Sequence, residues 1–259
     1  MGLITPNRHM HRFYISPENW NLGALALTGP EAHHARDVLR IRRGEKIVLF
    51  NGQGREITAE IADVSGEEVR LRMLHEAKTP PLQCHIVLGQ AIPKGKNMEL
   101  IVHKAVEIGA AEIAPIISDR TIVQVNSEGA SQKQAKWQQI AIEAAKQCGQ
   151  NWLPRVHTPR KLAELFSVDA EESFDLGLIG SLQPGAQHLK EVLADYSSEH
   201  QHRPRSVLML IGPEGDFTPA ELALGRRHGC QPITLGPIIL RVETAAIYCL
   251  SILSYELLI

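Results

Sequence analysis

The chain has 259 residues, of which 44% are hydrophobic and 22% charged, and its formal net charge is −2. This composition is typical of a globular protein with enough apolar material for one large or two smaller domains. It excludes a protein-wide basic field, so any binding of nucleic acid must depend on a local patch of Lys and Arg.

The cysteines and histidines give no sign of a metal centre. The four cysteines include no CxxC pair, and the twelve histidines form no HExxH motif and no His/Cys cluster. We therefore expect a reduced, cytoplasmic protein without a metal. No apolar run reaches the roughly 18 residues of a membrane span and no signal peptide is visible, so no membrane association is expected. Residues 1–9 are polar and patternless, and we set them aside as a possible tag or unstructured extension.

Residues 10–76 have mostly the pattern of strands. The expected strands are 11–15, 46–50, 56–64 and 68–74. In the last of these, Val69, Leu71 and Met73 alternate with arginines, which is typical of a half-buried antiparallel strand. A helix is expected to begin at Pro30, with apolar residues at helical spacing: Ala32, Ala35, Val38 and Leu39. These elements predict a small β-barrel domain.

A linker is expected at residues 77–82, where the sequence reads Ala77-Lys78-Thr79-Pro80-Pro81. Consecutive prolines end both helices and sheets. The second domain, residues 83–259, is expected to follow directly.

Beyond the linker, apolar strands alternate with helices. The expected strands are 86–91, 113–117, 174–179, 207–211 and 232–235. The expected helices are 98–108, 133–148, 218–228 and 243–258, and the first should bury Leu100, Ile101, Lys104, Ala105 and Ile108 on one side. This alternation predicts an α/β domain with a parallel sheet covered on both faces.

The usual phosphate-binding motifs are missing. The G-x-G at Gly52-Gln53-Gly54 falls between two expected strands and is interpreted as a hairpin turn. Gly89 and Gly95-Lys96 have the wrong spacing for a P-loop, and Asn97 replaces the Ser or Thr that would bind magnesium. A cofactor on this sheet must bind by another route.

Two loops near the C-terminus offer that route. The strand 207–211 runs into Gly212-Pro213-Glu214-Gly215-Asp216-Phe217, and the strand ending at Leu235 runs into residues 236–245, which open the last helix. Each loop alone is compatible with a structural tight turn. Since parallel strands place such loops at one edge of the sheet, where α/β proteins bind ligands, the pair favours a cofactor site.

Six stretches carry a resemblance to a known family. They are His33–Arg40, Lys94–Glu99, Lys104–Gly109, Gln147–Gly149, Ile211–Gly215 and Leu235–Ala245. In both domains and in this order, they resemble the RsmE family, bacterial methyltransferases of the SPOUT (α/β-knot) superfamily. That family methylates N3 of a uridine in 16S ribosomal RNA.

The resemblance implies a PUA-like N-terminal β-barrel for RNA and a C-terminal SPOUT domain with a deep trefoil knot. It also implies S-adenosyl-L-methionine as cofactor, a homodimer formed through the knots, and 16S RNA, within the 30S subunit, as partner. The implied cofactor residues are Leu210, Ile211, Gly212, Pro213, Gly215, Leu235, Gly236, Leu240, Arg241, Glu243, Thr244 and Ala245.

The chain departs from the common family pattern at four positions. Asp216 stands where many relatives have glycine, and Ile238 where arginine is frequent. Lys146 and Gln150 flank Gln147–Gly149, where Glu and Arg are frequent. The family pattern therefore does not identify the side chains that orient the base in this chain.

Methylation at uracil N3 requires loss of the N3 proton. Each pKa unit by which the protein favours the anion requires about 1.4 kcal/mol of differential stabilisation, and a fixed cation is the simplest source. Arg241 is the candidate, with a surface arginine as the alternative. Glu243 is expected to cap the last helix rather than to act as a base, and no His or Asp stands out as an obligatory base.

A local basic cluster is the candidate RNA surface. Its members are Arg12, Arg36, Arg40, Arg42, Arg43 and Lys46 in the first domain, with Lys94 and Lys96 in the second. Such a cluster suits phosphate contacts, although a solvated helix face fits the same pattern.

Two other functions remain open. A non-catalytic RNA-binding or ribosome-assembly protein could keep the fold, although it would not need intact cofactor loops. A nucleotide-dependent metabolic enzyme is the other alternative, and the missing phosphate motifs oppose it.

Overall fold

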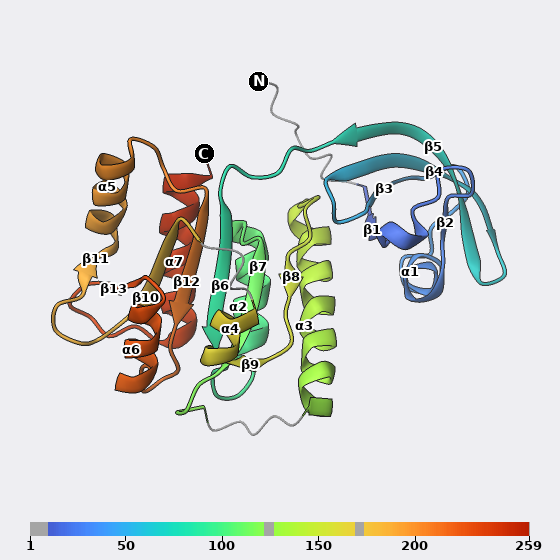
Figure 1. Ribbon diagram of the computed structural model, residues 1–259. Coiled ribbons are helices and arrows are strands. Elements are labelled where there is room, and N and C mark those ends of the chain that lie inside the picture. The colour runs from blue at the N-terminus through green and yellow to red at the C-terminus, as the bar shows by residue number, and fades with distance from the viewer. Residues whose placement is uncertain (1–9, 122–126, 169–173, 259) are drawn as a thin grey trace. The chain divides into compact units, whose positions relative to one another are not determined.

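The computed structural model describes residues 10–121, 127–168 and 174–258 (Figure 1). The chain divides into two compact units. The first comprises Met1–Pro81 together with Ile142–Leu153, and the second comprises Leu82–Ala141 and Pro154–Ile259. The possible tag at residues 1–9 lies outside the described residues.

The first unit contains a five-stranded sheet in the order β1-β3-β4-β5-β2. Its elements are β1 (Arg12–Tyr14), β2 (Ala26–Leu27), α1 (Gly29–His33), β3 (Lys46–Phe50), β4 (Arg55–Ser65) and β5 (Glu68–Lys78). β1 pairs with β3 in parallel, whereas the other pairs are antiparallel. Phe13, Ile47, Leu49, Ile57 and Ile61 form the centre of its hydrophobic core.

Three expectations for this unit need correction. The linker begins later than expected, because Ala77 and Lys78 still pair with Glu56 and Arg55 of β4. The alternation in β5 fails at Met73, which is 44% exposed, next to a register shift at which Leu74 of β5 is left out of the pairing with β4. The helix at Pro30 makes one α-turn and then a π-helical turn over His34–Val38, which leaves Val38 60% exposed.

The second unit is built on an eight-stranded parallel sheet in the order β11-β13-β10-β12-β6-β7-β8, with β9 also paired to β7. Its strands are β6 (His85–Ala91), β7 (Glu112–Ile117), β8 (Arg155–Val156), β9 (Arg160–Lys161), β10 (Leu176–Gly180), β11 (Gln187–His188), β12 (Ser206–Ile211) and β13 (Cys230–Thr234). Its helices are α2 (Asn97–Ile108), α4 (Leu162–Val168), α5 (Leu189–His200), α6 (Pro219–Arg227) and α7 (Val242–Leu257); α3 (Ser127–Cys148) begins in this unit and ends in the first.

Both faces of this sheet are covered, as the apolar strands predict. α7 packs on α2, β6 and β12 (Figure 1). On the other face, Leu208 and Leu210 of β12 pack with Leu162 and Leu165 of α4 and with Leu222 of α6. Successive residues of β12 therefore point into two different cores.

Of the side of α2 that was expected to be apolar, Ile101 and Ala105 are buried but Leu100 is not. Met98, Ile101, Val102, Ala105 and Val106 are buried, whereas Leu100 is 45% exposed. The helix ends at Gly109, whose φ of 95° is the left-handed conformation that favours glycine. α3 starts six residues before the expected Lys133. No helix among the described residues is long and apolar enough to cross a membrane.

The amino edge of the parallel sheet carries a carboxylate between two histidines. His85 Nε2 lies 3.0 Å from Glu112 Oε1, and His157 Nε2 contacts Glu112 Oε2. The contact with His157 has the largest effect and that with His85 the next largest, and together they lower the pKa of Glu112 to about 2 although partial burial opposes this. An acid whose pKa is depressed in the folded state contributes stability above its unfolded pKa, and that stability is lost as pH falls.

We therefore expect the free energy of unfolding to decrease as pH falls from about 5 to about 2. Glu112→Gln should flatten this part of the profile, as measured by urea unfolding at a series of pH values. Glu45→Gln, at an exposed carboxylate, serves as the control. An unchanged slope in Glu112→Gln would assign the acid sensitivity to other carboxylates.

In the first unit, Lys146 forms a largely buried ion pair with Glu31. Its Nζ lies 2.9 and 3.1 Å from the two oxygens of Glu31 and 3.0 Å from Glu143 Oε1. The side chains of Lys146 and Glu31 are 10% and 18% exposed. Burial raises the pKa of Glu31, and Lys146 opposes this rise. The departure from the common family residue at position 146 thus has a local partner.

Lys146→Met should destabilise the protein by about 3 kcal/mol, because it leaves Glu31 buried without its cation. The loss should be larger at pH 8 than at pH 5, since only the ionised carboxylate pays the full desolvation cost. The double variant Glu31→Gln/Lys146→Met should recover most of the loss in urea unfolding. A double variant no more stable than Lys146→Met would show that the pair is not coupled.

Candidate functional site

The carboxyl ends of β12, β10 and β13 meet at one edge of the parallel sheet, and the segments that follow them enclose a pocket of about 440 Å³. The pocket is lined on one side by Ile211–Glu214 and Asp216, and on another by Leu235, Gly236 and Ile238–Glu243. The two loops singled out in the sequence therefore lie together.

The structure brings most of the expected cofactor residues to this pocket. Those that line it are Ile211, Gly212, Pro213, Leu235, Gly236, Leu240, Arg241, Glu243 and Ala245. Leu210 lies behind the wall, fully buried in β12 over Gly89. Gly215 and Thr244 belong to the same two segments but do not line the pocket.

Sequence reasoning missed a third wall, which is formed by Gly180 at the end of β10 and by Ser181 and Leu182 after it. The signal was present, because the apolar strand before Gly180 was expected to belong to the same parallel sheet. Asn97, at the start of α2, also lines the pocket. The last two residues of β13, Ile233 and Thr234, line the pocket as well.

The first loop reverses tightly after β12. The N–H of Asp216 donates to the carbonyl of Pro213 at 2.9 Å. A Cβ on Gly212 would lie 3.0 Å from the nitrogen of Phe217 and 3.2 Å from the carbonyl carbon of Asp216, so a larger residue would force this backbone apart by a few tenths of an ångström. α6 then begins at once, with Thr218 as N-cap and Glu221 completing a capping box.

Three contacts tie this loop to neighbouring loops. Glu214 Oε1 accepts from the N–H of Lys94 at 2.8 Å, after β6. Arg120, after β7, donates to the carbonyl of Gly215. Asp216 Oδ2 accepts from the N–H of Leu182 at 3.0 Å, after β10. The loop is thus held from three sides.

Glu221 of α6 forms hydrogen bonds that hold the end of the first loop in place. Its side chain is buried, and it accepts from the hydroxyl of Ser118 at 3.2 Å and from the N–H of Asp119 at 3.0 Å. It also accepts from the N–H of Thr218 at 2.8 Å. The start of α6 and the loop that carries Arg120 are therefore one hydrogen-bonded unit.

The second loop ends at Arg241, which is the N-cap residue of α7 but makes no side-chain cap. Its side chain is exposed, lines the pocket, and has no hydrogen-bond or ion-pair partner among the described residues. Glu243 was expected to cap α7 through its carboxylate. Instead, its Oε2 accepts from Asn97 Nδ2 at 3.2 Å, because the side chain turns toward α2 and leaves only its charge near the helix start.

The chemical character of the pocket is mixed. Ile211, Ile238, Ile239 and Leu240 supply apolar surface, and Ile238 and Ile239 are 73% and 76% exposed. Glu214, Asp216 and Glu243 supply negative charge, and Arg241 a cation. The described residues hold no His, Cys, Asp and Glu group arranged to bind a metal. The pocket suits an organic ligand with both apolar and cationic parts.

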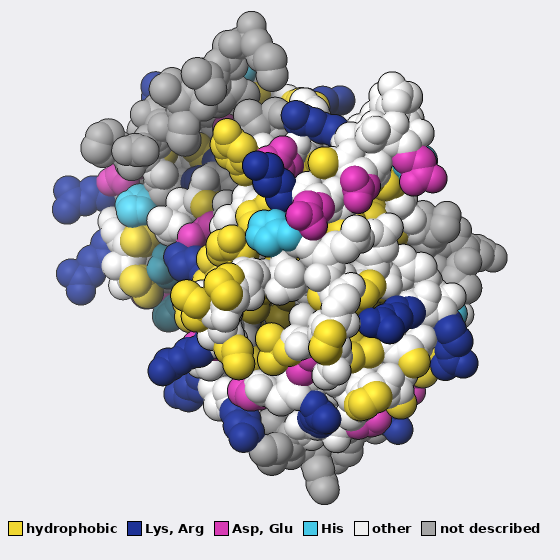
Figure 2. Space-filling view, turned by 90° about the vertical axis from the view of Figure 1, so that its left-hand side faces the viewer, with side chains coloured by type: hydrophobic (Ala, Val, Ile, Leu, Met, Phe, Trp, Pro, Cys, Tyr) yellow, Lys and Arg dark blue, Asp and Glu magenta, His cyan; other side chains and the backbone are white. Residues whose placement is uncertain are grey.

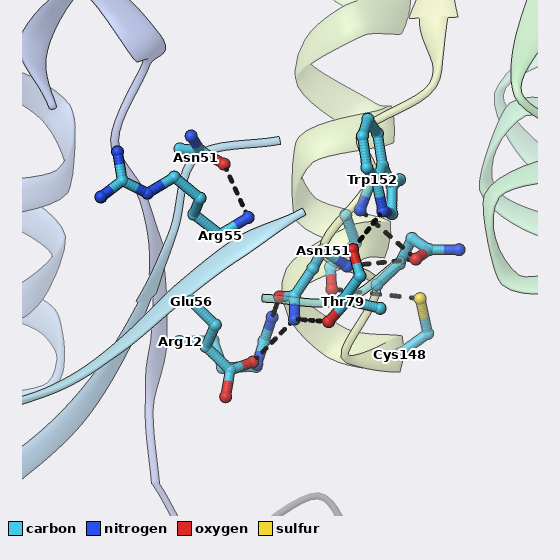
Figure 3. Close-up of polar contacts among 10 residues, drawn as sticks. Arg12, Asn51, Arg55, Glu56, Thr79, Cys148, Asn151 and Trp152 are labelled. Atoms are coloured by element: carbon cyan, nitrogen blue, oxygen red, sulfur yellow. Dashed lines mark hydrogen bonds and ion pairs between the residues drawn. The ribbon is translucent and has the colours of Figure 1, made fainter. Parts of the chain in front are cut away.

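The candidate RNA residues of the first unit fall into two groups. Arg12 is enclosed: its guanidinium donates to Glu56 Oε2 at 2.7 Å and to Asn151 Oδ1 at 2.6 Å (Figure 3). It also lies over the Phe50 ring. Arg36 pairs with Asp37 through two hydrogen bonds. By contrast, Arg40, Arg42, Arg43 and Lys46 are exposed.

In the second unit, Lys94 and Lys96 are also exposed, beside the tether from Glu214. Figure 2 views the molecule from the side of α5 and β11 and shows Lys and Arg side chains spread around the margin of that face, with hydrophobic side chains across its middle. On that face the Lys and Arg side chains do not gather into one patch.

Comparison with known proteins identifies the family. Residues 80–254 match the family described as RNA methyltransferase domain, and residues 27–74 match the RNA methyltransferase PUA domain. Ribosomal RNA small subunit methyltransferase E of Bacillus subtilis is 32% identical over 255 residues, covering 95% of this chain and 97% of its own length.

Solved structures agree. Ribosomal RNA small subunit methyltransferase E from Neisseria gonorrhoeae, bound to S-adenosyl methionine, superposes with a TM-score of 0.81 at 32% identity, covering 96% of this chain and 98% of its own. A methyltransferase from Legionella pneumophila in complex with SAM gives a TM-score of 0.83 at 33% identity, covering 95% and 98%. The chain therefore belongs to the ribosomal RNA small subunit methyltransferase E family of RNA methyltransferases.

Proposed function

We propose that the protein transfers a methyl group from S-adenosyl-L-methionine to N3 of a uridine in 16S ribosomal RNA. The observation that carries this proposal is the pocket at the carboxyl edge of the parallel sheet, walled by three loops that contain no phosphate-binding motif. Relatives that cover nearly the whole chain are named as small subunit ribosomal RNA methyltransferases, and two such structures of methyltransferases were solved with this methyl donor.

The residues of the pocket fit this donor. Its sulfonium and ammonium groups are cationic, and the carboxylates of Glu214, Asp216 and Glu243 face or border the pocket. Its adenine is neutral and planar, and can lie against Ile211 and Leu240 while backbone groups of the glycine-containing loops read its edge. When bound, the donor supplies an electrophilic methyl group on a positively charged sulfur.

Arg241 is the proposed catalytic residue. A uracil N3 must lose its proton before it can attack a methyl group, and a nearby guanidinium stabilises the resulting anion. Arg241 supports this role because it lines the pocket with no partner among the described residues. The adjoining start of α7 adds a positive dipole end. No side chain is assigned as the base, so solvent takes the N3 proton, and Arg241 holds the resulting anion in line for methyl transfer.

In this proposal, residues 10–76 form a PUA-like RNA-binding barrel and residues 83–259 a SPOUT domain with a deep trefoil knot. The PUA domain match supports the first, and the return of α7 from β13 onto α2 and β6 supports the second. Leu100 on α2 and Tyr248 and Tyr255 on α7 are exposed, which supports a homodimer through these helices. We place the protein in the cytoplasm, acting on 16S RNA within the 30S subunit.

The proposed RNA surface consists of Arg40, Arg42, Arg43 and Lys46, with Lys94 and Lys96 near the pocket. All are exposed, so they can exchange water and counterions for phosphates. Arg12 and Arg36 are left out, because each is already paired with an acidic side chain.

Arg241→Ala should lower methyl transfer by at least a hundredfold, since it removes the cation beside the developing uracil anion. The assay uses labelled S-adenosylmethionine with 16S RNA, naked and in 30S subunits, and mass spectrometry to locate the methylated uridine. Donor affinity, measured by calorimetry, should change far less than the rate. Arg226→Ala, at an exposed arginine of α6 outside the pocket, is the control. Unimpaired transfer by Arg241→Ala would remove Arg241 from the mechanism.

Arg42→Ala/Arg43→Ala should weaken RNA binding and reduce its dependence on salt. Loss of two phosphate contacts should lower the slope of log K against log salt by about 1.4 to 1.8, which filter binding at several salt concentrations can measure. Arg72→Ala is the control, because Arg72 already pairs with Glu60. An unchanged slope would place the RNA elsewhere.

A further inference from the structure

The third wall of the pocket has little secondary structure of its own. Gly180, the last residue of β10, lines the pocket together with Ser181 and Leu182, and no strand or helix follows until β11 begins at Gln187. The Leu182 side chain is 62% exposed, so burial contributes little to holding this segment in place. Its conformation must depend on hydrogen bonds.

Three successive N–H groups of this segment have three different acceptors. The N–H of Ser181 donates to the carbonyl of Ile233 in β13 at 3.0 Å, and the N–H of Gln183 donates to the hydroxyl of Ser181 at 3.1 Å. Between them, the N–H of Leu182 donates to Asp216 Oδ2 at 3.0 Å. Among the hydrogen bonds of the described residues, this one links the third wall to the first loop.

The backbone of Asp216 is unusual for a residue with a side chain. Its φ is 64°, in the left-handed region that glycine adopts most easily. A turn alone would be served at least as well by glycine. The carboxylate, however, bridges two segments, because Oδ1 accepts from the N–H of Phe217 at 2.8 Å while Oδ2 accepts from Leu182. The turn does not require this carboxylate, whereas the contact between the first loop and Leu182 does.

We infer that Asp216 is a positioning residue for the methyl donor, because its carboxylate holds residues 181–183 against the first loop and so preforms the third wall. This inference rests on the proposed function of the pocket as the donor site. A wall that is ordered before binding does not have to be ordered by the ligand, which favours affinity. Hydrogen bonds to an ionised acceptor are among the stronger ones available for this purpose.

Asp216→Gly separates the side chain from the backbone. Glycine keeps the left-handed turn without strain but removes both carboxylate contacts. We expect faster amide exchange of residues 181–183 in the ligand-free protein, measured by hydrogen–deuterium exchange. Calorimetry should show about tenfold weaker S-adenosylmethionine binding, or about 1.4 kcal/mol. At saturating donor, kcat should stay close to that of the wild type, so that KM for the donor carries the effect.

Two variants serve as controls. Gln201, at the end of α5, also has a left-handed backbone, with φ of 61°, and does not line the pocket. Gln201→Gly should therefore leave donor binding and exchange at residues 181–183 unchanged. Asp216→Asn keeps one acceptor oxygen and tolerates the same backbone, so its donor affinity should lie between those of the wild type and Asp216→Gly.

The outcomes separate this inference from the proposed function. If Asp216→Gly leaves exchange at residues 181–183 unchanged, its carboxylate does not hold the third wall and Asp216 is a turn residue only. If the wild type does not bind S-adenosylmethionine, the proposed function fails and the positioning role fails with it, whatever the exchange data show. If exchange rises but affinity does not change, the tether exists and the third wall does not contribute to binding.

Discussion

Between Gly212 and Phe217 the chain folds back so closely that a Cβ on Gly212 would touch the backbone of Asp216 and Phe217. The candidate site depends on this reversal. It directs Glu214, the carbonyl of Gly215 and Asp216 toward the loops after β6, β7 and β10, and each of these loops is hydrogen-bonded to it. Four strand ends are thereby joined through one turn, with buried Glu221 fixing the helix that follows. A rigid rim of this kind suits a reaction that depends on alignment.

Much of the fold follows from local patterns. The apolar strands, the helix start at Thr218-Pro219 and the helix end before Gly109 are visible in the sequence, because each reflects a short-range rule. Features that depend on distant partners were not. Residues 142–153 join the first unit, where Asn151 is hydrogen-bonded to Arg12, Glu56 and Thr79 (Figure 3). In the same unit Lys146 pairs with Glu31. The helical pattern of residues 133–148 does not indicate that the end of this helix belongs to the first unit.

Some parts of the candidate site could likewise be predicted from the sequence, and others could not. The two glycine-containing loops could be placed at one sheet edge because parallel strands end together, and they do enclose one pocket. The third wall after β10 and the contact between Asn97 and Glu243 depend on the order β10-β12-β6, which the sequence does not reveal. The enclosed state of Arg12 could not be foreseen either, since its partners lie 44 and 139 residues away.

Hydrogen–deuterium exchange of the wild type with and without S-adenosylmethionine tests the central claim most directly. If the tethered loops form the donor site, protection should appear at residues 180–183, 211–216 and 234–243. A second cavity lies at the amino ends of β10 and β13, lined by Phe166, Tyr196, His200 and His228 among others. Protection there, with none at the three loops, would contradict the account and place the ligand at the opposite edge of the sheet.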